Sequence, residues 1–353
     1  MKILITGVAG FIGFHLVRKL LSNLQDVEIV GIDSINDYYD LSIKYARLEE
    51  CGILKEQILI NQITESKTFS NYKFIQAQLE NKELLIKLFE TEKFDYVCNL
   101  AAQAGVRYSL TNPEAYLKSN IDSFLNLLEA CRFNPVKHFV FASSSSVYGL
   151  NDKLPFSTTD HTDHPVSLYA ATKKSNELMA HTYSHLFGIP ATGLRFFTVY
   201  GPWGRPDMAL FLFAKAILEN KPINVFNNGN MYRDFTYIDD ITEGIKRVLL
   251  AIPGSKQKTS PKENFSPDIS SAPYRIFNIG NNDPVKLLDF IEAIENELGK
   301  KAIKNFLPLQ PGDVPYSRAD VQSLVEVTGY CPKTQVKDGI REFIKWYKTF
   351  YNN

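Results

Sequence analysis

The sequence has little cysteine, no net charge and no long apolar run. It holds four cysteines in 353 residues, and none of them forms a C-x-x-C pair. This argues against a disulfide framework or a zinc ribbon, and it favours a reducing compartment such as the cytosol. Because no stretch of about 18 apolar residues occurs, we expect no membrane-spanning helix.

Positive and negative charges balance, with 39 Lys and Arg against 39 Asp and Glu. A chain with no global field of either sign is not expected to bind nucleic acid or an anionic membrane through bulk charge. Glycines interrupt the apolar opening and no small-residue cleavage site follows, so we expect no signal peptide. The protein is expected to begin at its first strand.

Short apolar runs alternate with amphipathic segments in the first half. Strands are predicted at Lys2–Thr6, Val27–Asp33, Tyr72–Gln76, Tyr96–Leu100 and His138–Ala142, and helices at Phe11–Ser22, Lys82–Glu90 and Pro113–Arg132. This alternation predicts an α/β fold, a doubly wound parallel sheet with helices on both faces. Ligands of such sheets bind beyond the carboxyl ends of the strands.

The alternation loosens after about residue 175. Helices are predicted at Phe211–Glu219, Leu287–Leu298 and Lys337–Tyr347, and we expect a smaller, mostly C-terminal α/β lobe over the sheet. Gly254–Ala272 is rich in Ser, Pro and Lys, which predicts a surface loop or lid. The predicted division is 1–175 and 176–353, with the chain returning to the first unit from its second half.

Glycines follow the first predicted strand with the spacing G-x-x-G-x-x-G, at Gly7, Gly10 and Gly13. Glycine permits a tight turn there, and the helix that follows offers free N–H groups to a pyrophosphate. Asp33 ends the next strand, where a carboxylate accepts ribose hydroxyls and repels a 2′-phosphate. Ser34 beside it offers no cation, so NAD is favoured over NADP. Taken singly, the glycines could form a simple turn and Asp33 could cap a helix or turn.

A phenol and an ammonium lie four residues apart at Tyr169 and Lys173, which places them on one face of a helix. A neighbouring ammonium lowers the pKa of a phenol, as a general base requires. The same spacing is common in exposed helices, but Ser143–Ser146 follow a predicted strand at the end where ligands bind. A serine there could hold a substrate oxygen or simply cap a helix.

Together these residues resemble an extended short-chain dehydrogenase/reductase over nearly the whole chain. Matching blocks also occur at Asn120, at Arg195–Pro202 (R-F-F-T-V-Y-G-P) and at Arg233–Asp240 (R-D-F-T-Y-I-D-D). The resemblance implies a Rossmann-type fold, with a catalytic triad of Ser144, Tyr169 and Lys173. It places NAD against Gly7, Gly10, Phe11, Ile12, Gly13, Asp33, Asn36, Gln78, Leu79 and Lys173.

Narrower blocks are similar to UDP-glucuronate 4-epimerases, namely Asp33–Asp40 (D-S-I-N-D-Y-Y-D), Ala101–Ser109 (A-A-Q-A-G-V-R-Y-S) and Gly201–Ala209 (G-P-W-G-R-P-D-M-A). Thr198 stands where related neutral-sugar epimerases usually have Asn. The chain departs from the family at Gln78, Ser34 and Asn99, where Asp, Asn and His are common. The resemblance implies a UDP-sugar site at Ser144, Ser145, Ser146, Tyr169 and Thr198, with the serines and Thr198 around the substrate carboxylate, and it places Arg205 and Arg233 at the UDP diphosphate. Arg107 follows a predicted strand and could contact sugar or phosphate or form a structural ion pair. Asp313 could contact the UDP ribose or cap a loop.

Ser145 and Ser146 stand where related 4,6-dehydratases have Asp and Glu, and where related decarboxylases keep the Glu. A hydroxyl does not replace a carboxylate as acid or base near neutral pH. We therefore expect 4-epimerisation of UDP-glucuronate to UDP-galacturonate. The alternatives are a 4-epimerase for UDP-glucose or UDP-N-acetylglucosamine, and a non-catalytic NAD-binding scaffold.

The resemblance also implies a homodimer, built through helices near Pro113–Arg132 and Ser175–Phe187. The first predicted unit would bind NAD and the second would mainly bind the UDP-sugar. Two histidine pairs, His161 with His164 and His181 with His185, lack other ligands of an obvious metal set. We therefore expect no metal.

Overall fold

A computed structural model describes residues 1–254, 266–310 and 314–351. Its main sheet has eight strands in the order β11-β7-β6-β5-β1-β2-β4-β3, all parallel except β3 against β4. They are β1 (Lys2–Thr6), β2 (Glu28–Asp33), β3 (Ile63–Glu65), β4 (Tyr72–Gln76), β5 (Tyr96–Asn99), β6 (His138–Ser144), β7 (Ala191–Phe196) and β11 (Tyr274–Ile279). From β1 the parallel strands follow in chain order on both sides, as β5, β6, β7 and β11 and as β2 and β4, with β3 at the edge. A crevice for ligands is therefore expected at the carboxyl ends of β1 and β5.

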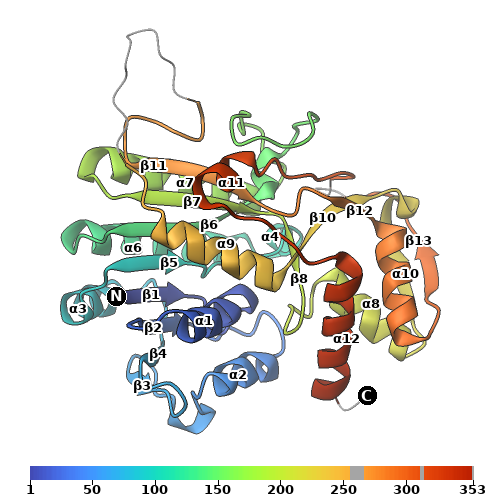
Figure 1. Cartoon of the computed structure of the whole chain (residues 1–353), viewed down its shortest axis with the longest axis horizontal. Helices are drawn as coiled ribbons and strands as arrows, with labels where there is room; N and C mark the ends of the chain where they lie inside the picture. Colours follow the sequence, from blue (N-terminus) through green and yellow to red (C-terminus); the bar gives the residue numbers. More distant parts are fainter. Residues whose placement is uncertain (255–265, 311–313, 352–353) are drawn as a thin grey trace.

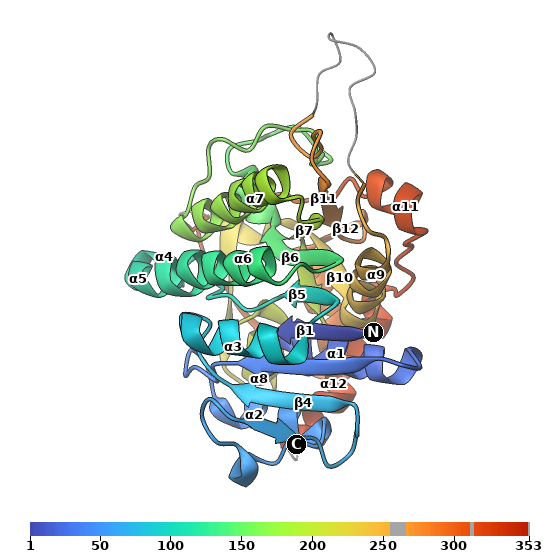
Figure 2. The same cartoon turned by 90° about the vertical axis from the view of Figure 1, so that its left-hand side faces the viewer.

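Helices cover both faces of this sheet (Figures 1 and 2). One face carries α3 (Lys82–Glu92), α6 (Ser123–Phe133) and α7 (Leu168–Phe187), and the other carries α1 (Phe11–Asn23), α9 (Ile238–Leu250) and α11 (Gln322–Thr328). Each face has its own apolar core: Leu85 and Leu127 are buried on the first, Phe14 and Ile245 on the second. The predicted doubly wound α/β fold is confirmed.

A second lobe lies at the right of Figure 1. It holds a three-stranded sheet of β8 (Thr198–Tyr200), β10 (Tyr232–Tyr237) and β12 (Pro284–Lys286), and a pair of β9 (Pro222–Val225) with β13 (Ile303–Phe306). The helices α8 (Ala209–Leu218), α10 (Leu287–Leu298) and α12 (Val336–Tyr351) surround a third core. Short elements complete the described chain: α2 (Leu41–Glu50), η1 (Lys55–Gln57), α4 (Tyr108–Thr111), α5 (Pro113–Tyr116), η2 (Leu117–Asp122), η3 (Ser145–Tyr148) and η4 (Phe226–Gly229).

Several boundaries differ from those predicted. Strand β6 continues through Ser144, so two of the four serines lie within the strand rather than after it. The predicted helix 113–132 is divided by a π-helical turn at Leu117–Asp122. Strands β7 and β11 bring the second half of the chain back to the first sheet, and α7 crosses residue 175.

Residues 255–265 of the predicted surface loop lie outside the described residues. The end that is described is anchored, because the buried Asp268 accepts hydrogen bonds from Thr158 and Ser266. Across the described parts of the chain, no helix is both long and apolar enough to cross a membrane.

Candidate active site

The glycine loop forms a tight cradle between β1 and α1. Gly7 has φ +76°, and a Cβ there would lie 2.8 Å from the Ala101 nitrogen. A Cβ on Gly13 would lie 2.1 Å from the Gly7 oxygen, so neither position accepts a side chain. Helix α1 starts at Phe11 with Gly10 as its N-cap, and first-turn amides have no partner within a helix. The cradle thus fits a diphosphate, held by amides of Phe11, Ile12 and Gly13.

Asp33 lies at the end of β2 with its carboxylate fixed by two amides. Oδ2 accepts from the Ala9 nitrogen at 3.0 Å, and Oδ1 accepts from the Ile35 nitrogen at 2.8 Å. A carboxylate has further lone pairs, so this group fits two ribose hydroxyls as well. Gln78 lines an open depression beside Ser34, at the place expected for an adenine, and Leu79 is buried behind it.

A cation lies near Asp33, although Ser34 itself offers none. The buried Lys44 of α2 donates from Nζ to the Asn36 carbonyl oxygen at 2.5 Å and to Asn36 Oδ1 at 2.7 Å. Burial lowers the pKa of Lys44, and the Asp33 carboxylate acts in the opposite direction. Sequence reasoning missed Lys44 because α2 itself was not predicted.

Tyr169, Lys173 and Ser144 come together at the carboxyl end of β6. Tyr169 lies in the first turn of α7, which Ser167 caps by accepting from the Ala170 nitrogen. Lys173, one turn further, is buried and donates to the Ala142 carbonyl oxygen at 2.8 Å. The Ser144 side chain lies close enough to Tyr169 to lower the pKa of its phenol.

The pKa of Tyr169 differs from the expectation. Burial raises the pKa of this phenol, while the Ser144 hydrogen bond and the Arg205 cation lower it. Lys173 was expected to tune Tyr169, but its ammonium is turned to Ala142. Burial lowers the pKa of Lys173 to about 8, so the amine still carries most of its charge at neutral pH.

The four serines have different environments. Ser143 is buried and donates to Glu177 Oε1 at 2.6 Å, so it supports the site from behind. Ser144 Oγ donates to Ser146 Oγ at 3.1 Å and accepts from the Ser146 nitrogen at 3.2 Å. Ser145 and Ser146 are half-buried. The end of β6 therefore presents hydroxyls and no carboxylate.

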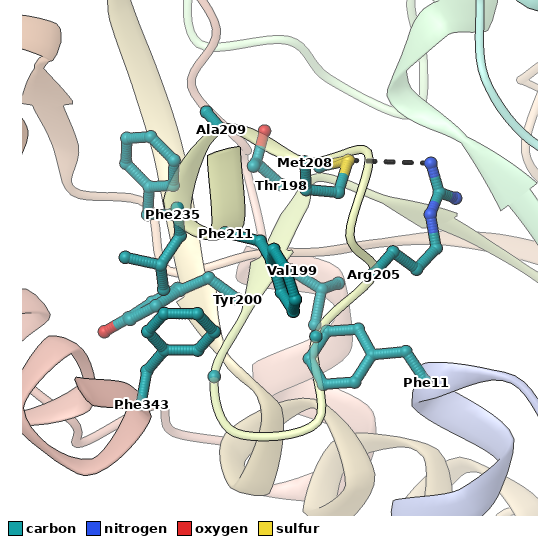
Figure 3. A pocket seen from close by; sticks show the side chains of 13 residues that line it. Phe11, Thr198, Val199, Tyr200, Arg205, Met208, Ala209, Phe211, Phe235 and Phe343 are labelled. Atoms are coloured by element: carbon teal, nitrogen blue, oxygen red, sulfur yellow. Dashed lines mark hydrogen bonds between the residues drawn. The ribbon is translucent and has the colours of Figure 1, made fainter. Parts of the chain in front are cut away.

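Thr198 and Arg205 line one pocket with Met208 (Figure 3). Aromatic rings of Phe11, Phe211, Phe235 and Phe343 form much of the remaining wall. Arg205 was expected at the UDP diphosphate, and here its guanidinium pairs with Asp207, with Nε–Oδ1 at 3.0 Å and Nη2–Oδ2 at 2.7 Å. An anion would have to share Arg205 with that carboxylate.

The other predicted substrate residues are more dispersed. The Arg107 guanidinium lies 5.2 Å from the centre of the Phe226 ring, so it reaches the second lobe from the loop after β5. Arg233, on β10, donates to the Tyr232 carbonyl oxygen at 3.2 Å. Asp313 lies outside the described residues.

Tyr116 is a site neighbour that sequence reasoning missed. Its ring centre lies 6.1 Å from that of Tyr169 in an edge-on contact, and its hydroxyl donates to the Ala104 carbonyl oxygen at 2.9 Å. Only the packing of α5 against α7 could have indicated that Tyr116 lies beside Tyr169. Among the described residues, no group of three or more His, Cys, Asp or Glu side chains could hold a metal ion.

Comparison with known proteins gives consistent matches. Residues 3–266 match the family described as "NAD dependent epimerase/dehydratase family". The chain is 54% identical over 356 residues to "Protein CapI" of Staphylococcus aureus, covering 99% of both chains. It is 43% identical over 351 residues to "Probable UDP-glucuronate 4-epimerase" of Rhizobium meliloti, covering 99% of this chain and 98% of that one.

A solved structure is also similar. It is the UDP-glucuronic acid 4-epimerase from Bacillus cereus in complex with UDP-glucuronic acid and NAD. The TM-score is 0.84 at 34% identity, and the match covers 99% of this chain and 100% of that one.

Proposed function

The chain belongs to the NAD dependent epimerase/dehydratase family, and from that premise we propose that it is an NAD-dependent UDP-glucuronate 4-epimerase. It interconverts UDP-glucuronate and UDP-galacturonate. The matches to proteins of that name, at 43% identity over nearly the whole chain and at a TM-score of 0.84, support this reaction.

One observation of the site carries the proposal. Tyr169 interacts with Ser144, and the next two side chains, Ser145 and Ser146, are hydroxyls. The site thus has one acid/base at the sugar C4 oxygen and no carboxylate on η3 that could act at C5. Oxidation and re-reduction at C4 need no second acid/base, whereas elimination does.

The residues of the chain have distinct roles in this reaction. NAD, when bound, would supply the hydride chemistry at C4. Tyr169 removes the proton of the C4 hydroxyl and later returns it, and Ser144 holds the C4 oxygen. Between these two proton transfers the 4-keto sugar rotates within the site. Lys173 keeps a positive charge beside the nicotinamide ribose, while the Gly7–Gly13 cradle and Asp33 hold the rest of the cofactor.

The substrate acid needs protection during the reaction. A 4-keto glucuronate is a β-keto acid and loses carbon dioxide readily. Hydroxyl donors from Ser145, Ser146 and Thr198 hold the carboxylate in a hydrogen-bonded setting. Carbon dioxide loss moves the negative charge from the carboxylate to the C4 oxygen, so donors that stabilise the carboxylate disfavour it and the cradle favours epimerisation.

Incubation with UDP-glucuronate tests the function, with the products resolved by NMR. We expect UDP-galacturonate to accumulate to an equilibrium mixture with no net change of cofactor redox state. Faster turnover of UDP-glucose or UDP-N-acetylglucosamine would assign a neutral-sugar epimerase instead. Accumulation of a 4-keto pentose as the main product would assign a decarboxylase.

We further propose that the enzyme is a homodimer and that it is cytosolic. Leucines on α6, α7 and the π-helical turn before α6 are exposed although apolar: Leu117 at 49%, Leu125 at 40%, Leu178 at 59% and Leu186 at 63%. Helices α6 and α7 lie side by side on one face (Figure 2). An exposed apolar surface of this kind supports self-association. The four cysteines are unpaired, which supports a reducing compartment.

A further inference from the structure

The loop Gly201–Met208, which carries Arg205, is held by residues of α2 and of the segment between β2 and α2. Two separate contacts hold it, one on each side of Arg205. Both come from the part of the chain that follows the Asp33 site.

Tyr38 makes the first contact. Its hydroxyl donates to Asp207 Oδ2 at 3.1 Å, and the same carboxylate accepts both Nε and Nη2 of Arg205. Arg205 is therefore aimed by Asp207, and Asp207 is aimed by Tyr38. Because the pair with Asp207 uses Nε and Nη2, Nη1 is the nitrogen of this guanidinium left for an anion.

Arg47 makes the second contact. It is fully buried, and its Nη2 donates to the Trp203 carbonyl oxygen at 2.6 Å. Its Nη1 donates to the Ala9 carbonyl oxygen at 2.8 Å and to the Tyr39 hydroxyl at 2.7 Å. Arg47 thus joins the glycine loop to the residues just before Arg205. Trp203 has φ +60°, a strained conformation for a bulky residue that needs such fixation.

The hydrogen-bond partners of Arg47 are neutral oxygens, and within the described residues it has no ion pair with a carboxylate. A buried cation without a counter-charge is costly. Ala9, which accepts from it, lies between Gly7 and Gly10 of the phosphate cradle. An anionic group in the cradle would supply part of the missing negative charge.

We propose that Tyr38, Arg47 and Asp207 are positioning residues that couple cofactor binding to UDP-sugar binding through the loop Gly201–Met208. The coupling rests on the proposed function only in that it takes NAD and a uridine diphosphate group as the two ligands. An anion on Arg205 steadies this loop, the loop holds Arg47, and Arg47 holds the glycine loop at Ala9. By thermodynamic linkage the effect is reciprocal.

Exchange of bound NAD against labelled NAD tests the coupling in the holoenzyme, with and without UDP. We expect UDP to slow this exchange by at least about fivefold, the lower end of typical coupling. Tyr38→Phe and Asp207→Asn should reduce that factor toward one, and Arg47→Lys should do the same by losing the guanidinium fork. Tyr183→Phe is the matched control, since it also removes a phenol–carboxylate hydrogen bond, to Glu129, but away from the loop. It should keep the full factor.

In steady state, Tyr38→Phe should raise the KM for UDP-glucuronate severalfold while kcat changes little. If UDP does not slow exchange in the parent enzyme, or if Tyr38→Phe and Asp207→Asn keep the full factor, the coupling is refuted. Neither exchange measurement requires turnover. Failure to epimerise UDP-glucuronate would therefore refute the proposed function and leave the coupling standing.

Discussion

At the scale of single residues, the acidity of Tyr169 depends on burial and on its hydrogen bond with Ser144. Burial raises the pKa of the phenol and Ser144 lowers it, so removal of the Ser144 hydroxyl should raise the pKa further. Because the base acts when deprotonated, Ser144→Ala should move the rising limb of kcat/KM to higher pH. The measurement is a pH–rate profile with UDP-glucuronate.

Tyr169→Phe is the companion variant for that profile. It should lower kcat by roughly 10²–10⁴-fold and remove the rising limb, while UDP binding stays near that of the parent. A Ser144→Ala profile that overlays the parent profile would show that this hydrogen bond does not control the base.

Thr198 and the Ser145–Ser146 pair should control whether the 4-keto acid keeps its carboxylate. Hydrogen bonds to charged groups contribute about 1.5–3 kcal/mol each, so their loss should destabilise the carboxylate and make the loss of carbon dioxide easier. Thr198→Ala, or Ser145→Ala with Ser146→Ala, should raise the ratio of 4-keto pentose to epimer in single-turnover NMR. The preference for UDP-glucuronate over UDP-glucose should fall as well. An unchanged ratio together with an unchanged preference would move the carboxylate site, with Arg107 as the next candidate.

Asp33 should account for much of the affinity for NAD. Its carboxylate fits the ribose hydroxyls and also accepts from Ala9 and Ile35. Asp33→Ala should weaken NAD binding by about 1–3 kcal/mol, measured by calorimetry on the apo-enzyme. Asp37→Ala is the control, because Asp37 is an exposed carboxylate four residues away. Equal losses in the two variants would indicate a general charge effect rather than a ribose contact.

The sequence predicted the triad from the spacing of Tyr169 and Lys173, from the serines that follow a predicted strand, and from the resemblance to an extended short-chain dehydrogenase/reductase. It could not predict the Tyr38–Asp207 hydrogen bond, which joins residues 169 positions apart. The sequence also could not predict that the pKa of Tyr169 is raised, since the burial of this side chain depends on the folded structure.

At the scale of elements, the sequence again reports local patterns but not burial in the fold, and this explains which strands and helices were predicted. Strands β1 and β4 and helix α10 were predicted with their observed bounds, because their apolar residues follow a clear period. Strand β7 was missed because Arg195 interrupts its apolar run. Helix α2 was missed because Lys44 and Arg47 look like surface residues, yet both are buried.

The Arg195–Glu177 ion pair neutralises the buried Arg195 cation of β7 and fixes α7 to the sheet. Arg195 Nε and Nη2 donate to Glu177 Oε1 and Oε2 at 2.8 and 2.9 Å, and Ser143 donates to the same carboxylate. Glu177→Gln should lower the free energy of unfolding by about 3–5 kcal/mol, because it leaves a buried cation uncompensated. Denaturant unfolding measures this change.

An exposed ion pair provides the control for Glu177→Gln. Asp338 lies 3.1 Å from Arg341 on the outer side of α12, where ion pairs contribute little. Asp338→Asn should therefore leave the unfolding midpoint almost unchanged. If Glu177→Gln is equally mild, the pair does not hold α7 against β6 and β7.

At the scale of the whole molecule, the two lobes meet where the strands of the main sheet end. Loops from the first lobe supply the glycine cradle, Asp33 and Tyr38, and the second supplies Thr198, Arg205 and Arg233. The sequence predicted this division of roles through its motifs. Some contacts between lobes, such as Arg47 to the Trp203 oxygen, involve backbone groups, which carry no sequence signal. Others, such as Tyr38 to Asp207, join side chains far apart in the sequence.

Assembly of the whole molecule should depend on the exposed leucines of α6 and α7. Leu125→Glu with Leu178→Glu places charges on that face, and charges buried in an apolar contact are costly. We expect this variant to sediment as a monomer, whereas the parent enzyme should sediment as a dimer. Leu59→Glu with Ile63→Glu is the control, since these side chains are also exposed, at 56% and 43%, but lie at the β3 edge of the sheet. A parent enzyme that sediments as one chain, or a control that dissociates to the same extent, would contradict a dimer built on α6 and α7.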